Sequence, residues 1–575
     1  MLCYRLIPVV FSKSGFTLAP MTQHFLSVMT CCGLLALSLK GTEIPGDEYF
    51  KVDTLAEGLV DAMEIAVVPT GDIFIAERTG ALKWYSPKTG ETKVVKEFEV
   101  SLKEKGFSRE TGLLGVTVDP DFLKNGWLYC YYSPKKPEEH RLARFTFKAG
   151  KLSDEKILLQ IPQSRENGVC HEGGSLSFDS KGHLFLSTGD NTNPFASDRY
   201  APLDERKGNE SINAQRSAAN SNDLRGKVLR IIPTANGKYR IPKGNLFPEG
   251  TDKTRPEIYV MGCRNPWRIG IDQKTDTLYW GDVGPDSRKD SSRGPRGYCE
   301  INQAQTAGYY GWPYFVGDNK AYARYDFEKK EVGEKYDPKQ PVNESRLNTG
   351  LKELPEPRVP FWFVGRSSFC AGPVYHYGDY PASESKLPKE LDSCLITYDW
   401  NNGKMQLSKI GSNNSLEWKV DWLHSKKFIH PSDVEMGVDG AMYVLEYGSG
   451  WYDSSDGKLK KVTYTSEAQE SGEEEADARL AGISPEHPGY ALLGEATCLS
   501  CHQTEAKSIG PRYLDVANRY RDDENAEKTL AGKIVNGGVG VWGEIPMPPH
   551  PQYSEEQVSQ MVDAILSMAP EGHNE

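Results

Sequence analysis

One short hairpin pattern recurs along most of this chain and limits the folds open to it. Each copy has an apolar residue, then a turn with Asp or Gly, then a short strand of apolar and aromatic residues. Asp and Gly favour tight hairpins, and such a strand has the composition of a buried one. Repeated hairpins at irregular spacing predict a β-propeller over residues 48–465, with loop insertions in its blades; a generic all-β sandwich is the alternative. The copies start at Val68, Val118, Phe178, Ile271 and Val438.

A second, smaller part begins near residue 485 and contains the sequence Cys-Leu-Ser-Cys-His. In this motif the thiols of Cys498 and Cys501 add to the vinyl groups of haem, and His502 ligates the iron. A chance occurrence or a redox pair would show the same five letters. The surrounding residues favour covalently bound haem c.

The chain around this motif resembles a class I bacterial cytochrome c, similar to the cytochrome c551 type, over residues 485–572. Leu530 and Ile534 share one face of a predicted helix. Met547 lies in a Pro-rich segment, and its thioether is a suitable second axial ligand. A core Met is the alternative, with His550 as the other candidate ligand. Two axial ligands leave no open position, so the haem is expected to carry electrons.

Four segments of the larger part resemble the soluble glucose/sorbosone dehydrogenase family, which uses pyrroloquinoline quinone (PQQ) and calcium on a six-bladed β-propeller. They stand in the family's order along the chain. The resemblance implies an all-β six-bladed β-propeller followed by a small all-α cytochrome c domain. The segments are Glu110-Thr-Gly-Leu-Leu-Gly-Val-Thr-Val-Asp-Pro-Asp-Phe, His171-Glu-Gly-Gly-Ser-Leu-Ser-Phe-Asp with Ser187-Thr-Gly-Asp190, Gly262-Cys-Arg264-Asn265-Pro-Trp, and Gly284-Pro285 with Glu300-Ile-Asn and Tyr310-Gly-Trp-Pro.

The resemblance implies that His171 is the general base that takes the hydroxyl proton of the substrate. An imidazole suits this role because it titrates near neutral pH. Arg264 and Asn265 match positions that contact PQQ, where a guanidinium can hold a carboxylate or stabilise charge on a quinone oxygen. A purely structural role is the alternative for His171 and for Arg264.

The resemblance also implies calcium ligands. The carbonyl groups of Gly284 and Pro285 match ligands of the calcium that polarises PQQ. Glu300 and Tyr310 match ligands of a structural calcium, and oxygen ligands suit this hard cation. Acidic residues in turns are usually only solvated, which is the alternative for Glu300.

The chain departs from the family where the quinone would bind. Glu110 stands where the family has Gln, and a carboxylate there would face an anionic cofactor. The family's Lys is expected within residues 395–401, where none occurs, and Lys404 is the nearest. Two Arg ligands are expected near residues 430–433, where none occurs, and Arg366 is a candidate substitute for one of them.

The N-terminal segment predicts export. Residues 25–39 are an apolar run that suits the core of a signal peptide within residues 1–40 and is short for a membrane span. Ala36 and Ser38 are placed for cleavage, Met21 is a candidate start, and an uncleaved anchor is the alternative. In either case we expect a periplasmic or extracellular protein, with no membrane span after cleavage. Covalent haem attachment agrees with export.

Six cysteines lie outside the haem motif and the N-terminal segment. In an exported protein they can form disulfides, and the sequence does not choose the pairing. Plain buried thiols are the alternative. These residues are Cys130, Cys170, Cys263, Cys299, Cys370 and Cys394.

The charge of the chain limits the kinds of partner that we expect it to bind. The formal net charge is −12, and no basic run interrupts it, so nucleic acid is not an expected partner. Residues 466–484 are acidic and predict a solvated linker between the two domains. Expected partners are a small sugar or polyol substrate and a downstream soluble electron carrier or terminal oxidase.

Three functions compete on this evidence. The first is an exported dehydrogenase that oxidises a sugar or related alcohol and passes electrons from PQQ to the haem. The second is a non-enzymatic carbohydrate-binding or docking propeller that carries an electron-transfer module. The third is a metal-dependent hydrolase, which would need carboxylates to converge near the propeller axis, with Asp190, Asp282 and Glu300 as candidates.

Overall fold

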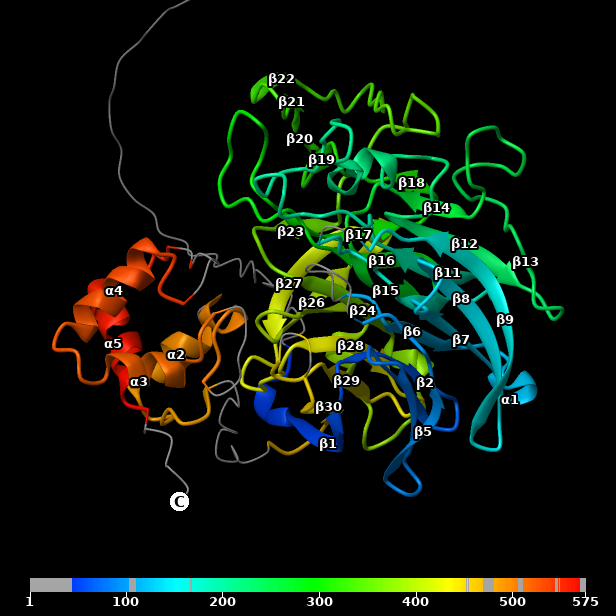
Figure 1. The fold of residues 1–575 in the computed structure, drawn as a ribbon. Helices are drawn as coiled ribbons and strands as arrows, with labels where there is room; N and C mark the ends of the chain where they lie inside the picture. The colour runs from blue at the N-terminus through cyan, green and yellow to red at the C-terminus, as the bar shows by residue number, and fades with distance from the viewer. Residues whose placement is uncertain are drawn as a thin grey trace, which may run out of the picture. The chain divides into compact units, whose positions relative to one another are not determined.

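The computed structural model describes residues 44–102, 110–165, 168–450, 452, 454–468, 480–495, 497–504, 510–542, 547 and 549–568. The predicted signal peptide lies outside the described residues, as does most of the predicted linker. Strands make up the larger domain and helices the smaller one (Figure 1).

Six sheets form the blades of a propeller, and their strands pair antiparallel except for β14 with β18 in the third sheet (Figure 1). Within each sheet the order of the main strands follows the chain, except in the last blade. There the N-terminal strand is the outermost. The blades consist of β2 (Ala62–Val67), β3 (Ile73–Glu77), β4 (Ala81–Ser86) and β5 (Glu91–Glu97); β6 (Leu113–Val118), β7 (Trp127–Tyr132), β8 (Glu139–Lys148) and β9 (Lys151–Pro162); β10 (Leu176–Phe178), β11 (Leu184–Thr188), β12 (Lys227–Pro233), β14 (Ile258–Met261) and β18 (Gly308–Tyr309), with β13 (Tyr239–Arg240) beside β12; β15 (Pro266–Asp272), β16 (Thr277–Asp282), β17 (Cys299–Ala304) and β23 (Trp362–Val364); β24 (Phe369–Tyr375), β25 (Cys394–Asp399), β26 (Lys404–Ile410) and β27 (Leu416–Trp422); and β28 (Pro431–Met436), β29 (Met442–Glu446), β30 (Gly457–Tyr464) and β1 (Phe50–Leu59).

The first strands of neighbouring blades contact one another all the way round: β2 with β6, β6 with β10, β10 with β15, β15 with β24, β24 with β28, and β28 with β2. Pairing of β1 with β30 joins the two ends of the propeller. The predicted six-bladed propeller is therefore confirmed. Two small sheets, β19 (Phe315–Val316) with β20 (Lys320–Ala321) and β21 (Ala323–Asp326) with β22 (Glu331–Lys335), belong to the insertion before β23.

The recurring hairpin pattern marks the turn between the first and second strands of a blade. It occupies this position in every blade except the one that begins with β24. In that blade residues 376–393 form a longer connection, so the pattern is missing there. In the third blade, for example, the N–H of Asp179 donates to the carbonyl of His183 and the N–H of Gly182 donates to Asp179.

A buried polar network joins the first strands across the propeller centre. Glu64 on β2 accepts from the N–H of Val116 on β6 at 2.7 Å and of Leu176 on β10 at 3.2 Å. Asp433 on β28 accepts from the N–H of Ile65 at 2.8 Å. Neutral donors and loss of water leave these carboxyl groups poorly solvated. Burial therefore raises the pKa of Glu64 to about 8 and that of Asp433 to about 6, while Arg268 acts against the rise.

The small domain is helical, as predicted. Its described residues form α2 (Pro488–Glu495), α3 (Tyr513–Tyr520), α4 (Ala526–Asn536) and α5 (Glu555–Leu566). Ser554 caps α5, since its side chain accepts from the N–H of Gln557, whose own side chain bonds back. The buried side chains of α5 pack against Tyr490 and Leu514 in one apolar cluster. In the part of the chain that the structure describes, no helix is long and apolar enough to cross a membrane.

The six propeller cysteines are buried free thiols. Of the two possibilities left open by the sequence, the structure therefore has thiols rather than disulfides at these positions.

Candidate functional site

Loops at one end of the propeller carry the candidate site. Blade strands alternate in direction, so the loops from one blade to the next share an end with the loops between second and third strands. The recurring hairpins lie at the opposite end. Glu110, His171 and Arg264 stand in connections between blades, and all three line one cavity of the propeller.

His171 is held in a restricted backbone conformation. Its φ is 69°, in the left-handed region that few non-glycine residues adopt. The backbone of residue 189 passes so close that a Cβ there would lie 2.0 Å from the His171 carbonyl oxygen, so only Gly fits. Nδ1 of His171 lies 2.8 Å from Oδ1 of Asp190. This contact leaves Nε2 as the ring nitrogen available to a substrate.

Asp190 is a buried carboxylate that remains ionised. Burial alone raises its pKa, but His171, Arg264 and a hydrogen bond from Trp312 outweigh burial, and the pKa lies below its usual range. The indole Nε1 of Trp312 donates to Oδ2 at 2.7 Å, and Thr192 donates to Oδ1 at 2.8 Å through its hydroxyl. A fixed negative charge of this kind stabilises a protonated His171.

Glu110 contacts the backbone of His171. Its Oε2 accepts from the His171 N–H at 2.7 Å. Burial raises its pKa, and His171 only partly offsets this. At this position, where the family has Gln, the carboxyl group thus fixes the loop that carries His171.

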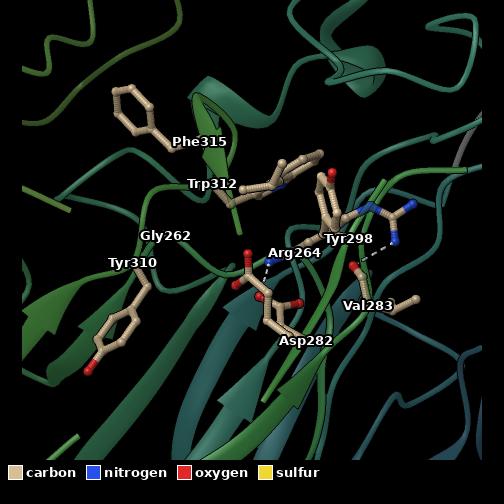
Figure 2. Close-up of a pocket in the computed structure, with 11 residues that line it drawn as sticks. Gly262, Arg264, Asp282, Val283, Tyr298, Tyr310, Trp312 and Phe315 are labelled. Carbon is tan, nitrogen blue, oxygen red and sulfur yellow. Dashed lines mark hydrogen bonds between the residues drawn. The ribbon is translucent and has the colours of Figure 1, made fainter. Parts of the chain in front are cut away.

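Arg264 and Asn265 are anchored through their backbones. Their N–H groups donate to the carboxylate of Asp282 at 2.9 and 2.7 Å. Figure 2 shows the bond from Arg264. The Arg264 guanidinium donates to the carbonyl of Val283 at 3.2 Å, and the Asn265 side chain accepts from the N–H of Gly173 at 3.0 Å. Both side chains line the same cavity as His171.

Asp282 and Glu300 face each other across β16 and β17, where they are register partners. They line a small cavity of about 10 Å³ together with Gly284, which also lines the cavity of His171. Figure 2 labels Asp282 at this small cavity. Burial raises the pKa of Asp282 to about 7. Burial and the charge of Asp282 raise that of Glu300 to about 8. Two buried carboxyl groups beside room for one small occupant are the donor chemistry that fits a hard cation.

The other predicted calcium ligands are placed less favourably. The hydroxyl of Tyr310 donates to the carbonyl of Gln303, although Tyr310 lines the small cavity, and Pro285 is not among the residues that line it. Among the described residues, no three His, Cys, Asp or Glu side chains are grouped to bind a metal. A cation there would need backbone carbonyls or water as further ligands. Asp190 bonds to His171 and does not line the small cavity, although its charge helps to raise the pKa of Asp282.

Of the two cations that the sequence named near the missing positions, one lines the cavity. Lys404 is exposed and is not among the cavity-lining residues, whereas Arg366 lines the cavity with an ion pair to Asp286 at 3.2 Å. At the position expected to hold Lys, Trp400 stacks on His430 with ring centres 4.3 Å apart. Sequence reasoning missed the other cavity-lining arginines because no motif surrounds them: Arg78, Arg199, Arg288 and Arg296.

The predicted haem residues lie within the helical domain. Nδ1 of His502 is 2.9 Å from the carbonyl of Pro511, which leaves Nε2 for iron. The His502 ring stacks on Tyr513, with centres 5.4 Å apart. Cys498 belongs to the apolar cluster, and Met547 packs against it. An apolar crevice beside a thiol pair and an oriented imidazole fits haem c.

Backbone pairing positions Met547. Its N–H donates to the carbonyl of Gly538 at 2.7 Å, and the return bond is 3.0 Å. His550, the other candidate ligand, is buried, and its N–H donates to the carbonyl of Ile534 at 2.8 Å.

The fold and these two sites define a propeller with a candidate dehydrogenase cavity, joined in one chain to a cytochrome c domain. Comparison with known protein families agrees with this two-part organisation. The sequence model of the Glucose / Sorbosone dehydrogenase family matches residues 59–350, and that of Cytochrome c matches residues 487–569. The chain belongs to the glucose/sorbosone dehydrogenase family and contains a cytochrome c domain.

Individual relatives match one part or the other. Cytochrome c-552 of Nitrosomonas europaea is 42% identical over 85 residues, covering 14% of this chain and 82% of that protein. An uncharacterized protein of Synechocystis sp. is 28% identical over 279 residues, covering 48% of this chain and 61% of that protein. A putative oxidoreductase (glucose dehydrogenase) from Thermus thermophilus has a TM-score of 0.51 and 22% identity, covering 72% of this chain and 99% of that one. This last likeness shows the fold alone.

Proposed function

We propose that this chain is an exported quinohaemoprotein dehydrogenase that oxidises a sugar or related alcohol, with electrons passing from PQQ to haem c. The observation that carries the proposal is the His171–Asp190 pair at 2.8 Å in a propeller cavity of a chain that also has a cytochrome c domain. Periplasmic or extracellular location follows from the apolar run at residues 25–39 and from the haem motif.

His171 acts as the base. Bound PQQ would supply the two-electron acceptor for the hydride that leaves the substrate carbon. Nε2 of His171 takes the hydroxyl proton, and ionised Asp190 stabilises the resulting imidazolium through Nδ1. The substrate thus loses one hydride and one proton. Arg264 and Asn265 would contact the cofactor from the cavity wall, and Arg264 would stabilise negative charge there.

The carboxylate pair suits calcium. Asp282 and Glu300, with the carbonyl of Gly284, would hold the ion, and calcium would supply a positive charge near the cofactor site. Asp282 also orders the site, since it accepts the N–H groups of Arg264 and Asn265.

The helical domain receives the electrons. Cys498 and Cys501 would attach the haem, and His502 and Met547 would ligate the iron. Haem would supply a one-electron acceptor, and two axial ligands keep substrate off the metal. A soluble carrier or terminal oxidase would then take the electrons onward.

A second candidate function is a carbohydrate-binding or docking propeller without catalysis. One observation favours it: Trp400 and Asn401 line the cavity in place of the expected Lys. Aromatic faces bind sugar rings without redox chemistry.

Haem reduction tests the proposal. The full-length haem-loaded protein is given PQQ and Ca²⁺, then a panel of sugars and polyols, and the reduced-haem absorption band is followed. A compound that reduces the haem only with both additions supports the dehydrogenase. His171→Ala should abolish the signal. His183→Gln is the matched control, because His183 pairs with Asp179 at 2.7 Å outside the cavity. No reduction by any compound, together with no PQQ binding by calorimetry, would leave the binding propeller as the better account.

A further inference from the structure

The propeller cavity collects positive charge in a chain whose formal net charge is −12. Among the described propeller residues that line it, arginines far outnumber carboxylates. A cleft with one sign of charge concentrates the field and attracts ligands of opposite charge. The arginines are Arg78, Arg199, Arg264, Arg288, Arg296 and Arg366, and the carboxylates are Glu110 and Asp286.

These arginines differ in exposure. Arg78 and Arg264 are 4% and 5% exposed and have partners inside the protein: Arg78 pairs with the buried Asp61, and Arg264 donates to a backbone carbonyl. The other four are exposed. Arg296 donates to the Tyr298 hydroxyl at 3.3 Å. We call the remaining three, Arg199, Arg288 and Arg366, the arginine rim.

The arginine rim is assembled from distant parts of the chain. Arg199 lies between β11 and β12, Arg288 between β16 and β17, and Arg366 between β23 and β24. Arg288 lies near enough to the other two to be influenced by their charges. Partial burial lowers the pKa of Arg288, and the charges of Arg366 and Arg199 lower it further. Asp286 offsets this repulsion through its ion pair with Arg366.

We propose that the arginine rim binds carboxylate groups of a ligand in the cavity, and so replaces the cations absent from residues 395–401 and 430–433. The inference rests on the proposed function in one respect, that this cavity is where cofactor and substrate bind. A guanidinium holds a carboxylate through two parallel N–H donors, and gathered like charges are relieved by a bound anion. The carboxylate has two possible sources: PQQ, or an acidic sugar such as a uronate.

Calorimetry on the full-length haem-loaded protein distinguishes these sources. PQQ, galacturonate and galactose are titrated separately, with Arg288→Gln and Arg366→Gln as test variants. Arg324→Gln is the matched control, since Arg324 is an exposed arginine with an ion pair to Glu344 at 3.0 Å. Arg324 does not line the cavity. Each rim variant should weaken the carboxylate ligand by about tenfold or more, because a hydrogen bond to a charged group is lost. Galactose and the control variant should show no change.

The outcomes separate this inference from the proposed function. Arginine-dependent binding of PQQ makes the cofactor the source, and arginine-dependent binding of galacturonate makes the substrate the source. Galacturonate binding without PQQ binding would support the proposal for the arginine rim and contradict the proposed PQQ-dependent dehydrogenase. PQQ-dependent haem reduction, with unchanged ligand affinities in both rim variants, would overturn the proposal for the arginine rim and support the proposed dehydrogenase. Failure of the wild type to bind either carboxylate also overturns the rim. Arg366→Lys, which keeps the charge and loses the fork, should lie between wild type and Arg366→Gln, and unchanged melting curves exclude misfolding.

Discussion

Replacing Arg268 with Met should destabilise the propeller more than any surface substitution. Arg268 is fully buried on β15. Its guanidinium donates to the carbonyls of Ser432 on β28 at 3.0 Å and of Met63 on β2. It therefore connects the first strands of three blades, and it is the cation that lowers the pKa of Glu64 and Asp433.

The magnitude follows from what the substitution leaves behind. Among the described residues, Arg268 bonds only to backbone carbonyls, but its charge lowers the pKa of the two buried carboxyl groups. Removing a buried charge that offsets another costs up to about 3–5 kcal/mol, because the remaining charge stays buried and uncompensated. The backbone carbonyls of Met63, Trp267 and Ser432 each lose a donor, which adds about 1–3 kcal/mol. Protonation of Glu64 or Asp433 limits the total. We therefore expect a loss of about 3–6 kcal/mol at pH 8.

The loss should depend on pH. A carboxyl group whose folded pKa is raised binds its proton more tightly in the folded state, so stability falls as pH rises through the window between its unfolded and folded pKa. In the wild type this window runs from about pH 4 to about 8 for Glu64. Without Arg268 the folded pKa of Glu64 and Asp433 rises further. The destabilisation should therefore be smaller at pH 5 than at pH 8.

Urea unfolding followed by tryptophan fluorescence measures this, since Trp280 on β16 is fully buried in the propeller. The control is Arg324→Met, which removes an exposed ion pair and should cost less than about 1 kcal/mol. Asp433→Asn completes a double-mutant cycle, in which the coupling with Arg268→Met should be about 1–3 kcal/mol. A loss below about 1 kcal/mol that is equal at pH 5 and pH 8 would refute the role of Arg268 as a buried charge partner.

Three further predictions concern the sites. Calcium should raise the melting temperature more at pH 8.5 than at pH 6, because Asp282 and Glu300, with pKa values of about 7 and 8, must lose their protons to bind it. The variant Asp282→Asn should lose most of this rise in melting temperature. An equal rise at both pH values would contradict the calcium site. Asp190→Asn should lower kcat for substrate-driven haem reduction by about 100-fold or more, since His171 loses its charged partner, and an unchanged rate would exclude the pair from catalysis. Met547→His should lower the reduction potential measured by spectroelectrochemistry, since a thioether raises it, and an unchanged potential would mean that Met547 is not a ligand.

Local patterns explain how much of the fold the sequence predicted. Each recurring hairpin is two strands and a turn that lie together in the chain, so composition identifies it. The same holds for Cys498 to His502 and for the capped helix after Ser554. The blade that begins with β24 escaped because its first turn is replaced by residues 376–393. The number of blades therefore came from the resemblance and not from counting hairpins.

The candidate site was predicted where its residues sit in family motifs, as His171 and Arg264 do. Asp282 was considered only as a hydrolase ligand, because its place beside Glu300 depends on the register of β16 with β17. Of the arginine rim, only Arg366 was named from the sequence, and Arg199 and Arg288 could not be found this way. A long guanidinium side chain can reach one cavity from many loop positions. A cavity that needs positive charge can therefore obtain it from an arginine at any of these positions. The absence of Lys and Arg from residues 395–401 and 430–433 thus shows only that these two loops bring no positive charge to the cavity. The charge of the whole cavity depends also on the loops of the other blades, and it is known only when the structure places them beside these two.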